Sequence, residues 1–308
     1  MSMIGDPAAV MVPEAVASEL ARVCTLEMKG HRWSRVNVDT ARRMLANQGQ
    51  GVLGVLAERV ARAQVSDPGW AVLTLPDELM DEELQRAAAG VLTALGWPFY
   101  SIEQGGRLWI GQESSPAADP ASFGGLGANP LHIDAPNVER VPDYTSLLVL
   151  RSDPAEGGAS LLGDLRAALA RITDSDRAEL RRPVYFEGRA QGLHGVGRAR
   201  LPFPVLEDAD DGRWIRWAGK MLHDHRNTGH LCALQRFAAA LSSVTQTVML
   251  RRGQLLIADQ QRIAHGRRAL GDQTGLATGT RRWLVQTKTT WEPSVPAQTP
   301  CFEGGSDG

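Results

Sequence analysis

A histidine and an aspartate stand two positions apart in the stretch "NPLHIDAPN", residues 129–137. In an extended segment, side chains at i and i+2 project from the same face, so His132 and Asp134 can reach one point together. Imidazole and carboxylate are both common metal ligands, although the same two groups can form a local hydrogen bond at a strand edge. The pair alone therefore leaves a metal site and a structural contact open.

A third candidate ligand comes much later, in "ADQQRIAHGRRALG", residues 258–271, where His265 follows an apolar run. Two histidines and one carboxylate, with the remaining positions open, form the ligand set of non-heme Fe(II) oxygenases. The open positions can take a bidentate 2-oxo acid and O2. Arg282 then offers a planar guanidinium that suits the far carboxylate of a 2-oxo diacid. Together these residues predict an oxygenase that uses iron and a 2-oxo acid.

A rival metal site is conceivable in "LHDHRNTGH", where His223, His225 and His230 lie close together in the sequence. Aspartate and arginine surround these histidines and no cysteine joins them, which favours a solvated loop or lid over zinc binding. The three cysteines form no Cys-x-x-Cys pair, so we expect reduced thiols and neither a zinc knuckle nor a disulfide scaffold.

The elements that must position these residues follow from the hydrophobic periodicity. Helical spacing predicts helices over residues 13–25, 51–66, 77–96, 165–172 and 231–246. Apolar and β-branched runs predict strands over residues 70–76, 107–112, 144–151, 157–164, 183–188, 247–259 (two strands and a turn) and 281–291. Alternation within the last strand places Arg281 and Arg282 on opposite faces, with Arg282 inward. No glycine-rich phosphate or dinucleotide motif is present, so the order favours a mainly β fold with flanking helices, a sandwich or jelly roll.

Composition places the chain among ordinary globular proteins, with 308 residues, 43% hydrophobic residues and a formal net charge of −2. This charge argues against a nucleic-acid partner, and no apolar run is long enough for a membrane span. The first residues lack a signal-peptide pattern, so we expect a cytoplasmic protein. We expect a single domain over residues 1–292, followed by a flexible tail over 293–308. Within the domain we expect a helical part over 1–66 and a jelly-roll core over 67–292, with an insert or lid over 189–230.

The segments "LHID", "LLVLRSDPAEGGASLLGD", "ADQQRIAHGR" and "RRWL" occur in the order found in one known family. In them the chain resembles the taurine dioxygenase/clavaminate synthase-like superfamily of Fe(II)/2-oxoglutarate oxygenases. The resemblance implies a double-stranded β-helix, with Fe(II) bound by His132, Asp134 and His265. It further implies that Arg282 binds 2-oxoglutarate, that Ser160 contacts the same carboxylate, and that O2 is the oxidant.

One position departs from the family pattern, because Gln286 stands where relatives carry an arginine for the substrate's own acid. An amide pairs with an amide or a hydroxyl and cannot neutralise an acid. We therefore expect a substrate without a free acid at that end, such as a carrier-bound aminoacyl group, a cyclic dipeptide or another neutral natural-product intermediate. Asn137, just past the metal motif, is a second candidate substrate contact.

The reaction type also follows from the resemblance. Related halogenases replace the acidic ligand with a small residue, whereas Asp134 is present here, so we expect hydroxylation; desaturation, epoxidation and cyclisation use the same ligands and stay open. One alternative is a hydroxylase of a free polar or basic amino acid, with an acid-binding cation from residues 189–230. Another is a non-catalytic jelly-roll binding protein. The oligomeric state and the pathway stay open.

Overall fold

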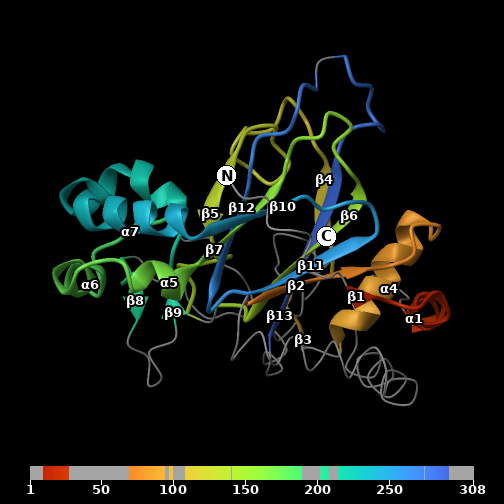
Figure 1. Cartoon of the computed structure of the whole chain (residues 1–308), viewed down its shortest axis with the longest axis horizontal. Helices are drawn as coiled ribbons and strands as arrows, with labels where there is room; N and C mark the ends of the chain where they lie inside the picture. Colours follow the sequence, from red (N-terminus) through yellow and green to blue (C-terminus); the bar gives the residue numbers. More distant parts are fainter. Residues whose placement is uncertain are drawn as a thin grey trace, which may run out of the picture.

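The computed structural model describes residues 10–27, 69–93, 97–99, 108–139, 141–188, 202–207, 214–273 and 275–290. Within these ranges the chain is mainly β with helices on both sides, as the sequence predicts (Figure 1). The predicted helix 51–66 and the predicted tail 293–308 lie outside the described residues. In the part of the chain that is described, no helix is long and apolar enough to cross a membrane.

The larger sheet has seven strands in the order β1-β2-β11-β6-β13-β3, and β4 also pairs with β13. All neighbours are antiparallel except β1 and β2. Its strands are β1 Val10–Met11, β2 Trp70–Thr74, β3 Trp97–Phe99, β4 Ile110–Glu113, β6 Tyr144–Arg151, β11 Gln254–Asp259 and β13 Trp283–Thr290. The predicted strand 144–151 coincides with β6 because it is a buried β-branched and leucine-rich run bounded by charged residues.

The second sheet has four antiparallel strands in the order β10-β7-β12-β5. Its strands are β10 Thr245–Val248, β7 Ser160–Asp164, β12 Ile263–Arg267 and β5 Asn129–His132. A separate pair is formed by β8 Leu206–Glu207 and β9 Trp214–Ile215. The stretch 113–130, rich in Gly, Pro, Ser, Ala and Asp, forms no strand between Glu113, which ends β4, and Asn129, which begins β5.

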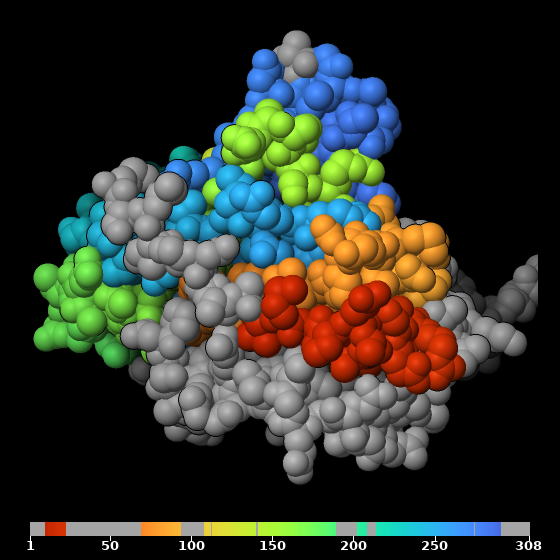
Figure 2. All heavy atoms as spheres, turned by 45° about the vertical axis from the view of Figure 1, so that its right-hand side comes forward, coloured from red at the N-terminus to blue at the C-terminus, as the bar shows by residue number. Residues whose placement is uncertain are grey.

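Helices cover the outer face of each sheet. On the larger sheet, α1 Glu14–Glu27 and α4 Asp81–Thr93 pack through Leu20 and Leu84 against Leu148 and Leu255; Figure 2 shows the two helices side by side. On the smaller sheet lie α5 Leu165–Leu169, α6 Asp174–Leu180, α7 Leu231–Ser243 and the 3-10 helices η2 Gly219–His223 and η3 His225–His230. The helix predicted over 77–96 begins only at Asp81, after a turn.

The inner faces of the two sheets share one apolar cluster, which includes Leu147, Leu162, Ile263 and Leu284. On β13, Val285 faces α1 and α4 while Leu284 faces inward. The period of two therefore turns the even-numbered positions of this strand toward the space between the sheets. The chemistry-bearing residues lie beside this shared core.

One expectation needs correction in the segment that precedes α7. Residues 183–188 do not form a strand, since only Tyr185 makes an isolated bridge, to Phe203. The described parts of 189–230 contribute buried side chains, among them Trp217 and Met221, to the core under α7. Their mixed composition hides these apolar residues; whether 189–230 also serves as a lid stays a prediction.

Candidate active site

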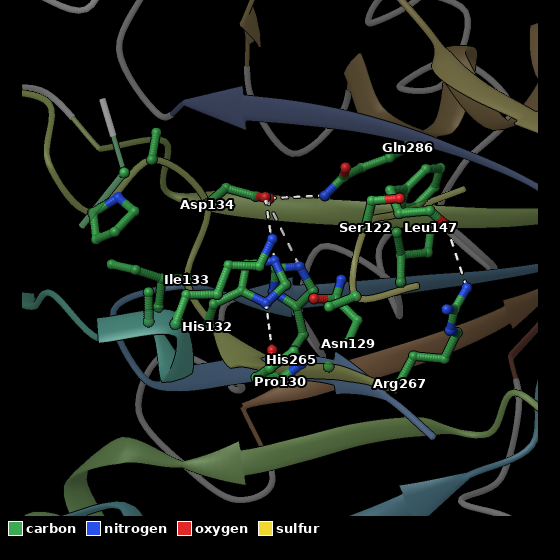
Figure 3. A pocket seen from close by; sticks show the side chains of 18 of the residues that line it. Ser122, Asn129, Pro130, His132, Ile133, Asp134, Leu147, His265, Arg267 and Gln286 are labelled. Atoms are coloured by element: carbon green, nitrogen blue, oxygen red, sulfur yellow. Dashed lines mark hydrogen bonds and ion pairs between the residues drawn. The ribbon is translucent and has the colours of Figure 1, made fainter. Parts of the chain in front are cut away.

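His132 and His265 lie directly opposite each other on the antiparallel strands β5 and β12. Asp134 follows two residues after His132, just past the end of β5. Its Oδ1 lies 4.0 Å from His132 Nε2 and 3.9 Å from His265 Nε2 (Figure 3). The three ligand atoms all lie within 4.8 Å of one another, so the group can hold a metal ion. The structure thus brings together the three residues that the sequence singles out.

The state of each side chain suits metal binding. His132 Nδ1 lies 2.8 Å from the carbonyl of Pro130, which can only accept, so Nδ1 carries the hydrogen and Nε2 keeps a free lone pair. Burial lowers the pKa of His265 to about 3, so the imidazole is neutral at neutral pH. Burial alone would raise the pKa of Asp134, but the nearby Lys288 charge helps hold it below its usual value. Two neutral imidazoles and a carboxylate are the donor set that Fe(II) oxygenases use.

Buried amides fix the aspartate. Gln286 Nε2 donates to Asp134 Oδ2 and to Thr145 Oγ1, each at 2.9 Å. Gln260, which is fully buried, accepts from the Asp134 backbone N–H. The backbone here is strained, because the next residue, Ala135, has a φ of 53°. The contacts of Gln286 and Gln260 hold Asp134 beside it. The amide nitrogen of Gln286 is thereby engaged with the metal motif instead of facing substrate alone.

Arg282 lies in the same pocket and is only 7% exposed. Burial and the neighbouring Arg267 charge lower its pKa to about 9, so the guanidinium stays charged at neutral pH. It makes no hydrogen bond or ion pair with any described residue, and Asp153 acts on it only as a more distant charge. Ser160, also buried, lines the same pocket. A buried charge without a partner is unfavourable, so this position is suited to an anionic ligand.

The glycine before Ala159 and Ser160 is needed for this arrangement. Gly158 has a φ of 73°, and a Cβ there would lie 2.4 Å from a Leu270 side-chain carbon and 3.3 Å from Arg282 Nε. Any larger residue would therefore displace the arginine or its surroundings.

Arg267, which the sequence did not single out, ties a loop to the pocket. Its guanidinium donates to the carbonyls of Phe123, Gly125 and Gly127, so that the loop after β4 is fastened to β12. Figure 3 shows Arg267 beside Ser122 and Leu147 on the pocket wall. Part of the loop between β4 and β5 therefore lines the site.

Further charged side chains in the pocket are not among the residues that the sequence singles out. Lys288, Lys220 and Glu187 all line it, and Lys288 Nζ lies 3.8 Å from Asp134 Oδ1. A signal for Lys288 existed, since it shares the inward parity of Arg282 and Gln286 on β13. Glu187 was hidden in the wrongly predicted strand, and Lys220 in the segment without periodicity. The cavity has a volume of about 390 Å³, enough for a small ligand.

Irregular chain at this side of the pocket is held by buried polar groups. Asn227, fully buried, accepts from the Phe186 N–H and donates to the Phe186 carbonyl, each at 2.9 Å. These bonds replace the strand ladder that residues 183–188 were expected to make. Asn137 Nδ2 donates to the Glu187 carbonyl at 3.2 Å, so this predicted substrate contact positions a neighbour.

The loop after Asp134 has its own brace. Arg216, 2% exposed, donates to the carbonyls of Pro136 and Val138 at 2.9 and 2.6 Å. It also pairs with Glu207 through Nε at 2.6 Å. A buried guanidinium thus satisfies backbone acceptors that no strand partner reaches.

The rival histidines do not assemble a second site among the described residues. His230 Nδ1 lies 2.7 Å from Glu179 Oε1, in an ordinary side-chain pair. In the described ranges, the one group of three that could hold a metal is His132, Asp134 and His265.

Comparison with known proteins gives an independent view of this geometry. Residues 62–218 match the family described as taurine catabolism dioxygenase TauD, TfdA family. An asparagine oxygenase solved with Fe(II), 2S,3S-3-hydroxyasparagine and succinate has a similar structure, with a TM-score of 0.70 and 22% identity over 92% of this chain and 93% of that one.

A second similar structure is the non-heme iron oxygenase OrfP with Fe and alpha-ketoglutaric acid. Its TM-score is 0.68, with 20% identity over 93% of this chain and 95% of that one. These likenesses show a shared fold, and they extend past the family match to the region of His265 and Arg282.

Proposed function

Because the chain belongs to the taurine catabolism dioxygenase TauD, TfdA family, it is a 2-oxoglutarate-dependent dioxygenase that uses Fe(II) and O2, and we propose that His132, Asp134 and His265 are its iron ligands. The clustering of their ligand atoms, the free Nε2 of His132 and the ionised Asp134 support this assignment. In this proposal the two facing sheets are the double-stranded β-helix of the superfamily.

We further assign the far carboxylate of 2-oxoglutarate to Arg282, with Ser160 as a second contact. The observation that carries the assignment is the buried guanidinium, which makes no hydrogen bond or ion pair with the described residues. A carboxylate would satisfy it in bidentate fashion. Arg267 holds the adjoining loop and keeps this end of the pocket closed.

The reaction we propose is hydroxylation of an unactivated C–H bond. Iron with 2-oxoglutarate and O2 supplies the oxidant, and the balance is R–H + 2-oxoglutarate + O2 → R–OH + succinate + CO2. The chain's own residues orient the two organic molecules and exclude water. Gln286 and Gln260 keep Asp134 in place throughout, since one bonds its carboxylate and the other its backbone.

The substrate is, in this proposal, a small amino acid or a compound derived from one. The asparagine oxygenase was solved with 2S,3S-3-hydroxyasparagine and OrfP with L-Arg, so proteins of this fold act on or bind amino acids. The expectation of a substrate without a free acid rested on Gln286, whose amide nitrogen bonds Asp134 and Thr145. Lys220, from within 189–230, is the cation that would favour a free amino acid.

The test is an aerobic assay with Fe(II) and 2-oxoglutarate, offering each L-amino acid, the matching amides and a set of cyclic dipeptides. Succinate release is measured together with the mass of one added oxygen atom. We expect coupled succinate and hydroxylated product with at least one of these compounds. Firm binding of iron and 2-oxoglutarate without succinate from any compound would instead support the binding-protein alternative.

A further inference from the structure

The pocket is lined by more positively charged than negatively charged side chains. Four cationic residues line it against two carboxylates: Lys220, Arg267, Arg282 and Lys288 against Asp134 and Glu187. Fe(II) and a doubly charged 2-oxoglutarate would cancel each other, so the loaded pocket would keep its excess of positive charge. An additional anionic group is therefore favourable there.

The cations fall into two sets, which we call the arginine end (Arg267, Arg282) and the lysine end (Lys220, Lys288). Arg267 is a nearby charge that acts on Arg282, whereas Lys288 acts on Asp134 and Lys220 on Glu187. Arg282 and Lys288 are six positions apart along the chain, which is roughly 20 Å of extended backbone. One small dicarboxylate cannot satisfy both ends, so the lysine end is left for a different ligand.

Lys288 is placed to meet that ligand. Its side chain is 14% exposed and faces the pocket, and its distance of 3.8 Å from Asp134 Oδ1 is longer than a hydrogen bond. The other oxygen of Asp134 accepts from Gln286. Once iron engages the same carboxylate, the ammonium would keep donors for a substrate anion.

Glu187 offers the opposite charge in the same cavity. Burial raises the pKa of its carboxyl, and the nearby Lys220 charge offsets this only in part. A cationic group of a ligand would stabilise the ionised form. The Glu187 backbone is fixed from two sides, by Asn137 and, through Phe186, by Asn227.

We propose, building on the function given above, that Lys288 binds the carboxylate of a free amino acid and that Glu187 accepts an ammonium group of the same molecule. Lys288 then supplies the positive charge that relatives place at the position of Gln286. It lies two residues later, on the same inward face of β13. The substrate class is a zwitterionic amino acid, and acid-free derivatives are poor substrates.

The wild-type experiment compares each free L-amino acid with its α-amide and its N-acetyl derivative in the succinate assay. We expect the preferred amino acid to exceed both derivatives by about 100-fold in kcat/KM, because each derivative leaves one partly buried charge without its partner. Equal turnover of acid and amide would overturn the proposal. Failure of all compounds, with no anaerobic iron–2-oxoglutarate absorption band, would instead overturn the proposed function itself.

Variants then locate the two contacts. Lys288→Met should raise KM for the amino acid about 100-fold with a smaller change in kcat, and abolish the preference over the amide, while Lys288→Arg keeps the preference. Glu187→Gln should abolish the preference over the N-acetyl compound. Both neutral variants should keep the anaerobic band, which reports on iron and 2-oxoglutarate only. Loss of the band in Lys288→Met, or a larger KM effect in Lys220→Met, would contradict the assignment.

Discussion

The arginine end of the pocket and the segments that carry Lys220 and Glu187 are built in different ways. Ser160 is the first residue of β7 and Arg282 directly precedes β13, so ladder hydrogen bonds fix the backbone beside both residues. Glu187 and Lys220 stand on chain outside any sheet, and buried polar side chains such as Asn227 supply the missing bonds. Regular structure thus holds the groups proposed for the cosubstrate, and individual side chains hold much of the substrate surface.

This difference has an energetic consequence. A strand residue keeps its place through many shared backbone bonds, so the loss of one side chain leaves the backbone in position. An irregular segment depends on a few buried donors and acceptors, and each one that is lost leaves an unpaired polar group. Substitutions at the braces should therefore act on folding, and substitutions at the arginine end on binding.

The largest effect should come from the proposed iron ligand that lies beside Lys288. Asp134→Ala removes this carboxylate, which lies 3.8 Å from Lys288 Nζ. We expect no detectable iron binding by calorimetry and no succinate release with any substrate. An exposed carboxylate, Glu78→Ala, serves as the control and should change neither. Full activity in Asp134→Ala would remove the basis of the metal assignment.

The next effect concerns stability on the side of the irregular chain. Arg216→Met leaves Glu207 and the carbonyls of Pro136 and Val138 without their buried partner. We expect the free energy of unfolding to fall by about 3–5 kcal/mol, measured by chemical denaturation. Arg182→Met, at a surface pair with Glu179, should cost less than about 1 kcal/mol. Equal losses of unfolding free energy in the two variants would mean that the buried Arg216 contributes no more to stability than a surface ion pair.

A smaller effect should appear in metal affinity. Gln286→Leu keeps the side-chain volume but removes the hydrogen bonds to Asp134 and Thr145. We expect the Kd for Fe(II) to rise by about 10–100-fold, because partners of metal ligands contribute to affinity by orienting them. The control variant Gln254→Leu, on β11, carries the same substitution away from the metal motif and should leave the Kd for Fe(II) unchanged. If Gln286 instead meets substrate, the KM for the amino acid would change and the Kd for iron would not.

The smallest effect should come from the hydroxyl at the arginine end. Ser160→Ala removes the hydrogen bond proposed to 2-oxoglutarate while the guanidinium remains, so we expect KM for 2-oxoglutarate to rise about 3–10-fold. Ser160→Thr keeps the hydroxyl and should stay close to wild type. No change in KM, or a loss of stability with normal KM, would reassign the residue to the core.

Much of the arginine end could be predicted from the sequence, because alternation and glycine placement are local signals. Strand β6 coincides with its prediction, and the period of two along β13 correctly turns Arg282 inward. The same alternation would also have indicated Lys288.

Lys220 and Glu187 could not be predicted in the same way. Residues 183–188 carry strand-forming side chains, yet Asn227, far along the chain, takes up their backbone groups instead. Nothing near Arg216 in the sequence indicates that it braces the loop after Asp134. Contacts between distant polar residues leave no periodic pattern, so only the three-dimensional structure brings them to light.

The central claim is that the triad binds iron and that Arg282 binds the 2-oxoglutarate which coordinates this iron. Anaerobic absorption spectroscopy tests it most directly. Fe(II) and then 2-oxoglutarate are added to the wild-type protein and to Arg282→Ala. We predict a visible metal-to-ligand charge-transfer band in the wild type, and in the variant a band that appears only at about 100-fold higher 2-oxoglutarate. A wild type without the band, or a variant with an unchanged titration, would contradict the account.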